Sequence, residues 1–341
     1  MSTVYDYIVV GGGSAGCVVA NRLSENPANR VLLIESGRRD SDPWIHIPAT
    51  FFKVLGKGID IHPYASDPQA GLNGRPSIVP QGNVLGGGSS VNAMIYIRGH
   101  RNDYDTWSQM GCRGWSYDEV LPVFKALENN KALNGDYHGR EGTLAVSNPR
   151  HRHPLSEAFV KAAVEAGLKP NADFNGAEQE GVGFYQSTTN KGRRWSSAMA
   201  FLREAEKRAN VTVLTESKVA RVVFEGRRAV GVALLDGTVH RAAREIVLCA
   251  GAIATPRLLQ LSGIGNGAHL SSLGIEVVSD LPGVGENYQD HLEVPVQAET
   301  RQPISILGHD KGLKAVGHML RYLTSKQGLL ASNVVECGGF V

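Results

Sequence analysis

Three glycines near the start of the chain have the spacing of a phosphate-binding turn. Gly11, Gly13 and Gly16 follow the apolar run 4–10 and precede small and apolar residues that predict a helix. In this setting the first glycine permits a tight turn, the second lets the backbone approach a pyrophosphate, and the third allows close packing of helix on strand. Because the N–H groups at the start of a helix attract anions, the pattern predicts a dinucleotide site.

A carboxylate follows where such sites bind a ribose. Glu35 closes the second buried run, 31–35, about twenty residues beyond Gly16. A carboxylate there accepts hydrogen bonds from ribose hydroxyls and repels a 2′-phosphate, so NADP is disfavoured. The plainer alternative is a glycine-rich turn followed by a surface glutamate. The strand, the helix and the acid together favour the dinucleotide site.

A second glycine cluster has donors for the far end of a long cofactor. Residues 86–90 read Gly-Gly-Gly-Ser-Ser and lead into the apolar segment 91–97. Their hydroxyl and backbone N–H groups suit the isoalloxazine or ribityl part of FAD. The glycines at 263–265 and 283–285 do not open a helix after a strand, so a second dinucleotide site is not predicted. A flexible surface loop is the alternative interpretation of residues 86–90, and the apolar flank disfavours it.

The elements that must position these residues follow from hydrophobic periodicity and turn residues. Strand, glycine turn, helix and strand over residues 4–35 form a βαβ unit, which implies a parallel sheet. Residues 38–80 are rich in proline and are expected to be irregular. An irregular segment of this length in a compact domain is usually functional, so a lid or a wrap around a cofactor is predicted. Further helices are predicted over 118–128, 154–167, 196–209 and from Thr255 to Gly263. Further strands are predicted over 211–215, 220–224, 229–235, 238–241 and 246–250.

Composition and charge exclude several classes of protein. Of 341 residues 42% are hydrophobic and the formal net charge is +2, whereas a disordered chain has fewer apolar residues and a larger net charge. No basic excess indicates nucleic acid as a partner. The four cysteines form no CxxC pair and the histidines are scattered, so no metal site is predicted. Without a secretory signal or a long apolar stretch, a cytoplasmic protein with no transmembrane segment is expected.

Three longer segments carry a resemblance to a known family. Together with Gly11–Gly16 and Glu35, the segments 84–99, 251–265 and 281–291 resemble the signatures of the glucose–methanol–choline (GMC) flavoprotein oxidoreductases. The resemblance covers essentially the whole chain. It is strongest to the choline-dehydrogenase-like branch of bacterial alcohol dehydrogenases and oxidases.

The resemblance implies an α/β fold with two interleaved domains. A Rossmann-like FAD-binding domain, with a doubly wound parallel sheet plus a β-meander, is expected at residues 1–150 and 205–293. An α+β substrate domain, incomplete at the C-terminus, is expected at residues 151–204 and 294–341.

The resemblance also implies which residues hold FAD. The pyrophosphate and ribose are assigned to Gly11, Gly13, Ser14, Gly16 and Glu35. The residues assigned to the flavin are Val84, Gly87, Asn92, Ala93 and Met94. The backbone of Val219 is assigned to the adenine. Ala250 and Gly251 are expected to pass close to the cofactor at the carboxyl end of a strand. Some relatives attach FAD covalently through a histidine. The matching position here is Val91, so a non-covalent flavin is predicted. Gly88 stands where Ser or Cys is common, which removes a side-chain donor.

The activity implied is oxidation of the CH–OH group of a small alcohol by hydride transfer to flavin N5. The electron acceptor, oxygen or another molecule, is left open. The family's proton-accepting histidine lies beyond the last residue here, so no residue of this chain is predicted to be catalytic, and His291 belongs to a loop motif. Two alternatives remain: a catalytically inactive flavin-binding protein, and a redox-neutral enzyme similar to hydroxynitrile lyases.

Overall fold

The computed structural model describes residues 4–341 and separates them into two compact units. Unit 1 comprises the chain up to Ser41, Lys57–Val91 and Ser196–Val296. Unit 2 comprises Asp42–Gly56, Asn92–Trp195 and Gln297–Val341. Residues 92–150, which the sequence analysis assigned to the nucleotide-binding domain, cluster with unit 2. What each of the two predicted domains binds stays a prediction.

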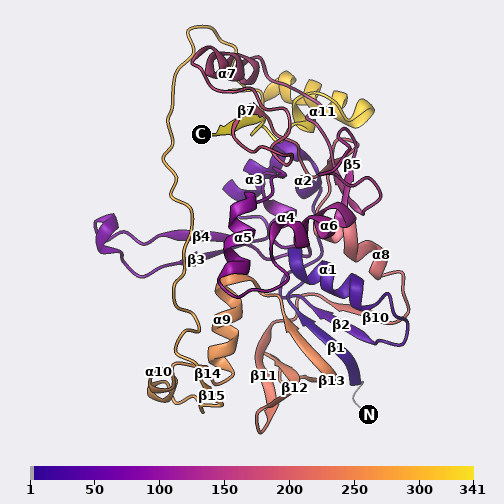
Figure 1. Ribbon diagram of the computed structural model, residues 1–341, viewed down its shortest axis with the longest axis vertical. Coiled ribbons are helices and arrows are strands. Elements are labelled where there is room, and N and C mark those ends of the chain that lie inside the picture. The colour runs from indigo at the N-terminus through magenta and orange to yellow at the C-terminus, as the bar shows by residue number, and fades with distance from the viewer. Residues whose placement is uncertain (1–3) are drawn as a thin grey trace. The chain divides into compact units, whose positions relative to one another are not determined.

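Unit 1 is built on a six-stranded sheet with the strand order β10–β2–β1–β13–β12–β11 (Figure 1). Its strands are β1 Val4–Val10, β2 Val31–Ile34, β10 Val211–Leu214, β11 Val219–Glu225, β12 Arg228–Leu234 and β13 Val239–Leu248. Strands β10, β2, β1 and β13 run parallel, and β13, β12 and β11 form an antiparallel meander. The predicted α/β fold with a parallel core and a meander is confirmed.

The other elements of unit 1 connect or follow these strands. Its helices are α1 Ser14–Leu23, η2 Ala70–Leu72, α4 Gly88–Val91, the π-helix η3 Ala198–Leu202, α8 Arg203–Ala205, α9 Gly251–Leu261 and α10 Gly267–Ser272. Two-stranded sheets pair β3 Ile61–Ala65 with β4 Ile78–Gly82, and β14 Ile264–Gly265 with β15 Ser279–Asp280. Because α1 joins β1 to β2, the predicted βαβ unit is confirmed, with the glycine turn between strand and helix.

The central strands of unit 1 are buried on both faces. On one face Ile8, Leu32 and Val232 form a core cluster against which Leu258 of α9 packs. On the opposite face Val9 and Leu33 are also 0% exposed. Strands of a parallel sheet are normally apolar for this reason, and residues 8–10 and 31–34 are apolar throughout.

Strand β13 is longer than either strand predicted for its residues. The sequence predicts two strands, 238–241 and 246–250, where the structure has one. The first part of β13 pairs antiparallel with β12 and the rest pairs parallel with β1. Between Tyr5 and Tyr7 the register with β1 shifts as in a β-bulge. The polar residues of the middle of β13 hid this continuity, because they resemble a loop in isolation.

Two predicted helices begin or end at different residues. Helix α9 begins at Gly251, so the predicted start at Thr255 is wrong, and Pro256 lies inside the helix. Gly251 takes a φ of +85°, which turns the chain from β13 into helix at once. The helix predicted over 196–209 ends at Ala205 and contains a π-turn, where Asn21 Nδ2 of α1 donates to the Phe201 carbonyl oxygen at 2.8 Å.

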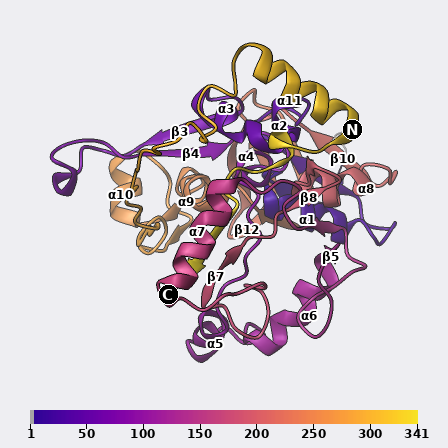
Figure 2. The same ribbon diagram turned by 90° about the horizontal axis from the view of Figure 1, so that it is seen from above.

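The segment 38–80 is more regular than predicted. Strands β3 and β4 form a hairpin, seen as a two-stranded ribbon in Figures 1 and 2. Pro63 and Pro80 lie opposite each other in its register. Proline removes a donor from a ladder and is tolerated in edge strands, which both strands of a two-stranded sheet are. The prolines therefore concealed this hairpin from pattern analysis.

Unit 2 consists of helices and short strand pairs. Its helices are α2 Pro43–His46, η1 Pro48–Thr50, α3 Phe51–Gly56, α5 Arg101–Gln109, α6 Tyr117–Leu127, α7 Pro154–Glu165, α11 Gly312–Ser325 and η4 Leu329–Ala331. Its strands are β5 Glu128–Asn130, β6 Leu144–Val146, β7 Gly181–Phe184, β8 Thr189–Asn190, β9 Arg193–Arg194 and β16 Cys337–Phe340. Ile47, Tyr322 and Ala331 form a core cluster with partly buried neighbours from the same elements. Across residues 4–341, no helix has the length and apolar character that crossing a bilayer requires.

Candidate functional site

A cavity of about 840 Å³ lies in unit 1 at the carboxyl ends of three parallel strands. Val10, Ile34 and Leu248, the last residues of β1, β2 and β13, all line it. Open α/β sheets bind ligands outside the carboxyl ends of their strands, and a volume of this order suits a cofactor. The cavity is therefore the candidate functional site of this unit.

The N-terminus of α1 opens into this cavity. Gly13 is the N-cap of α1 and, with Ser14 and Ala15 of the first turn, lines the cavity. The first N–H groups of a helix have no intrahelical acceptor, and the helix dipole places partial positive charge there. Since Gly13 has no side chain, these donors face the cavity directly, which is the arrangement that binds a phosphate.

The two glycine clusters predicted from the sequence meet at this point. The Gly86 N–H donates to the Gly12 carbonyl oxygen at 2.7 Å. A Cβ added at Gly87, where φ is +50°, would lie 2.7 Å from Gly13 Cα. The turn at 11–16 and the bend at 86–88 thus touch through backbone atoms and form a glycine cradle, a part of the cavity wall without side chains.

Glu35 lies at the edge of the same cavity. Its carboxylate accepts the Gly12 N–H at 2.7 Å through Oε2 and the Gly37 N–H at 2.8 Å through Oε1. Burial raises the pKa of the Glu35 carboxyl above its ordinary value, and these hydrogen bonds act in the opposite direction. A carboxylate offers about four acceptor positions, so Glu35 retains capacity for a ligand hydroxyl.

A second helix N-terminus also lines the cavity. Ala250 is the N-cap of α9, and Gly251 begins the helix three residues after Leu248, the last residue of β13. Alanine has no polar side-chain atom with which to cap the helix, so the first N–H groups of α9 are available to a ligand. The cavity thus has two positive helix ends, which favour a ligand with separated acceptors or negative charge.

Most predicted site residues are brought together. Those that line the cavity are Gly11, Gly13, Ser14, Glu35, Gly87, Val219, Ala250 and Gly251. Gly16 and Val84 pack beside it: a Cβ at Gly16 would lie 1.9 Å from the Gly11 carbonyl oxygen, and Val84 is fully buried. Asn92, Ala93 and Met94 belong to unit 2. Whether each of these residues contacts a cofactor stays a prediction.

The hairpin β3–β4 supplies lining residues that sequence reasoning missed. His62 and Tyr64 of β3 and Gln81 of β4 line the cavity, and their rings and amide add polar contacts. Arg257 of α9 stacks over the Tyr64 ring, with its guanidinium carbon 5.8 Å from the ring centroid. The sequence predicted a functional role for 38–80 from its length alone. His62 and Tyr64 are two positions apart, the spacing of side chains on one face of a strand. This spacing was the one local signal that could have identified the two residues.

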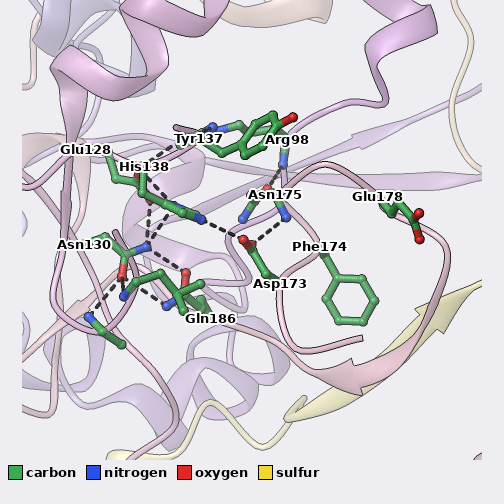
Figure 3. A network of polar contacts seen from close by, with 12 residues as sticks. Arg98, Glu128, Asn130, Tyr137, His138, Asp173, Phe174, Asn175, Glu178 and Gln186 are labelled. Carbon is green, nitrogen blue, oxygen red and sulfur yellow. Dashed lines mark hydrogen bonds and ion pairs between the residues drawn. The ribbon is translucent and has the colours of Figure 1, made fainter. Parts of the chain in front are cut away.

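A separate network of buried polar side chains lies in unit 2 (Figure 3). Glu128 of β5 accepts hydrogen bonds from Arg98 Nη2 at 2.9 Å and from the Gly139 N–H at 2.8 Å. The His138 ring lies between two carboxylates, with Nδ1 3.1 Å from Glu128 Oε1 and Nε2 2.9 Å from Asp173 Oδ2. Both ring nitrogens lie beside carboxylate oxygens, an arrangement that favours the doubly protonated, charged ring.

The charge on His138 follows from its two partners. Burial disfavours the charged ring, but hydrogen bonds and negative charge from Asp173 and Glu128 outweigh it and raise the pKa of His138 to about 9. The same contacts lower the pKa values of Glu128 and Asp173 despite their burial. The sequence gives no hint of this network, because its members are far apart along the chain.

We expect this network to make stability depend on pH. Because the folded pKa of about 9 exceeds the ordinary 6.5, the stabilisation is complete below pH 6.5 and is lost as the pH rises through 9. The loss amounts to about 3 kcal/mol. Urea unfolding at several pH values should show this decline, and His138→Gln should remove most of it. The exposed His291→Gln is the matched control; an unchanged decline in His138→Gln would contradict this account.

Known proteins resemble this chain over nearly its whole length. A family model described as GMC oxidoreductase matches residues 5–293. The chain is 45% identical to an alcohol dehydrogenase (acceptor) of Pseudomonas putida and 44% identical to the mitochondrial choline dehydrogenase of Homo sapiens. Each match covers 99% of this chain, but only 62% and 58%, respectively, of those proteins. The chain therefore spans about three fifths of the length of these relatives.

Solved structures show the same fold. An FAD-dependent oxidoreductase from Chaetomium thermophilum is 34% identical with a TM-score of 0.87, covering 98% of this chain and 61% of that one. A formate oxidase of Aspergillus oryzae RIB40 is 26% identical with a TM-score of 0.87, covering 100% of this chain and 62% of that one. Both likenesses extend over both units described above.

Proposed function

Because this chain belongs to the GMC oxidoreductase family, we propose that its unit 1 cavity binds FAD and that the protein oxidises the CH–OH group of a small alcohol. The resemblance inferred from the signature segments is confirmed. Since the chain spans about three fifths of its relatives, the activity of the whole protein is inferred from this site and from relatives named alcohol and choline dehydrogenases.

One observation carries the proposal: a single cavity joins two helix N-termini, a glycine cradle and a buried carboxylate. Gly13 and Gly87 pack backbone against backbone in the cavity wall, so no side chain separates the backbone N–H groups from a phosphate in the cavity. Glu35 supplies the acceptor for ribose hydroxyls. These donors and acceptors match the polar groups of an adenine dinucleotide, so the residues present fit FAD.

Each group in the cavity has a distinct binding role. The N–H groups of Gly13, Ser14 and Ala15 would hold the pyrophosphate, and the backbone at Val219 would lie against the adenine. Ala250 and Gly251 would bring the N-terminus of α9 close to the cofactor. The partial positive charge at the N-terminus of α9 would stabilise negative charge on a neighbouring ligand. It would therefore favour a bound cofactor that gains electrons at this end of the cavity.

We extend the proposal to residues outside the cavity lining. Val84, Asn92, Ala93 and Met94 are assigned to the flavin by the family resemblance. Val91, which is 5% exposed, has no nucleophilic atom, so FAD would be held without a covalent bond. Bound FAD would supply the acceptor for a hydride taken from the alcohol carbon. A cytoplasmic location stays a prediction.

Anaerobic mixing of the FAD-loaded protein with alcohols tests this function. Loss of flavin absorbance near about 450 nm with a primary alcohol or choline is the expected result. Admitting oxygen afterwards distinguishes an oxidase from a dehydrogenase. Cleavage of a cyanohydrin with unchanged absorbance would contradict alcohol oxidation and indicate a redox-neutral lyase. A yellow protein inert to every alcohol and cyanohydrin would equally contradict it.

A further inference from the structure

The base of the hairpin β3–β4 is held by contacts within unit 1. Asp60, directly before β3, pairs with Arg38 through Oδ1 and Nε at 2.5 Å and through Oδ2 and Nη2 at 3.1 Å. The Asn83 N–H, directly after β4, donates to the Asp60 carbonyl oxygen at 2.7 Å. Gly82 packs against the glycine cradle, since a Cβ there would lie 2.6 Å from the Gly87 carbonyl oxygen. The hairpin is therefore attached beside the glycine cradle of the cavity.

One face of this hairpin carries the aromatic part of the cavity wall. His62 and Tyr64 are two positions apart on β3, so their side chains share a face, and both line the cavity. Their rings meet edge to face, with centroids 4.5 Å apart. Of the described residues that line the cavity, only these two have an aromatic ring. A flat ligand ring therefore finds its best surface on β3.

Helix α9 connects Tyr64 with the strand that is proposed to lie against the adenine. The guanidinium carbon of Arg257 is 5.8 Å from the centroid of the Tyr64 ring, and Arg257 itself lines the cavity. The next residue, Leu258, is 5% exposed and belongs to the core cluster against which Val219 packs. Consecutive residues of α9 thus contact Tyr64 of the hairpin and the part of the core beside Val219. This places the two walls of the cavity on either side of one helical turn.

These two walls offer what a purine ring requires. The edge of adenine carries donors and acceptors, with which the backbone of a strand can pair. Its faces are flat and apolar, and aromatic side chains stack on the faces of nucleic-acid bases. The negative face of a tyrosine ring attracts a guanidinium, so Arg257 restricts the orientation of Tyr64. A ring that is already oriented loses less freedom when a ligand binds.

We propose that Tyr64 packs against the adenine ring of bound FAD and that Arg257 is a positioning residue that holds the Tyr64 ring at the cavity wall. The inference rests on the proposed function, since it takes FAD as the ligand of the cavity. The alternative is that the hairpin only closes the cavity. In that case the loss of the Tyr64 ring would weaken every ligand alike, whether or not the ligand contains a purine.

Ligands with and without a purine separate these two roles. Tyr64→Leu is expected to weaken the binding of FAD and of ADP about tenfold, because the stacking surface is lost. The affinity for inorganic pyrophosphate, measured by competition with FAD, should change less than about twofold, because the N-terminus of α1 is unaltered. Tyr64→Phe keeps the ring and should bind all three ligands as the unaltered chain does. Ile78→Ala is the matched control, since Ile78 is 56% exposed on β4 and does not line the cavity. Equal weakening of FAD, ADP and pyrophosphate in Tyr64→Leu would overturn the proposal.

A double-mutant cycle tests the role of Arg257. Arg257→Met keeps a long side chain but removes the guanidinium, and we expect FAD binding to weaken about fivefold. In the Tyr64→Leu background the same change should alter the FAD affinity less than about twofold, because Arg257 acts through the ring. Arg227→Met, in the exposed turn between β11 and β12, is the control for loss of a cation from unit 1.

The outcomes distinguish this inference from the proposed function. Equal effects of Arg257→Met in both backgrounds would overturn the positioning role. Unaltered affinity of Tyr64→Leu for FAD and ADP would overturn the whole inference and leave the proposed function intact. Failure of the unaltered chain to bind FAD would overturn both.

Discussion

Replacing Gly13 by alanine is expected to abolish FAD binding while unit 1 stays folded. A Cβ at Gly13 would lie 3.9 Å from both the Cys249 carbonyl oxygen and Gly87 Cα, which is ordinary contact. The φ of −76° also suits any residue. The methyl group would nevertheless occupy the cradle where the phosphate must approach the backbone. We expect at least about 100-fold weaker FAD binding, or ~2.7 kcal/mol.

Two measurements check this prediction together. Titration with FAD should show the loss of affinity, and thermal unfolding of the cofactor-free protein should shift by less than about 4 °C, because a cap change costs under about 1 kcal/mol. Gly71→Ala, in η2 of the same unit with no atom within 4 Å of the added Cβ, is the control for a glycine replacement. Tight FAD binding by Gly13→Ala would mean that the phosphate does not lie at the N-terminus of α1.

Replacing Gly16 by alanine is expected to have the opposite pattern, a loss of folding. A Cβ there would lie 1.9 Å from the Gly11 carbonyl oxygen and 3.4 Å from Cys249 Cβ. The obstructing atom belongs to the backbone of the turn that follows β1, so no side-chain rotation relieves the clash. Helix α1 must move away from the sheet, and overpacking at a site this rigid costs about 3 kcal/mol or more.

Urea unfolding of the cofactor-free chain measures this loss. We expect the midpoint to fall for Gly16→Ala and to remain near that of the unaltered chain for Gly13→Ala and Gly71→Ala. The contrast between Gly13 and Gly16 matters most, because both belong to one motif and receive the same methyl group. Equal stability of the two variants would show that the third glycine has no packing role.

Local sequence patterns were sufficient where neighbouring residues determine the structure. Gly11, Gly13 and Gly16 lie between an apolar run and a helix, so their turn and the βαβ unit could be predicted. Glu35 follows β2 directly, and its place at the cavity edge is fixed by the parallel pairing of β2 with β1. These features depend on the residues next to them in the sequence and on the rule that a strand–helix–strand crossover pairs its two strands in parallel.

Features that depend on distant partners were not predicted. Strand β13 continues through polar residues because it pairs with β12 and β1 in turn, and neither pairing is visible locally. Gly251 begins α9 early because its backbone takes a positive φ at the end of a strand. Asn92 Oδ1 accepts a hydrogen bond from Arg194 Nη1, 102 positions away in the chain. Contacts of this range leave no local pattern from which to infer them.

A crystal structure of the chain grown with FAD tests the central claim most directly. We predict one elongated ligand whose phosphates accept hydrogen bonds from the N–H groups of residues 13–15 and whose ribose hydroxyls donate to Glu35. The same ligand should also touch the bend at 86–88. FAD bound elsewhere on the chain, with the cavity at the carboxyl ends of β1 and β2 holding only solvent, would contradict the account.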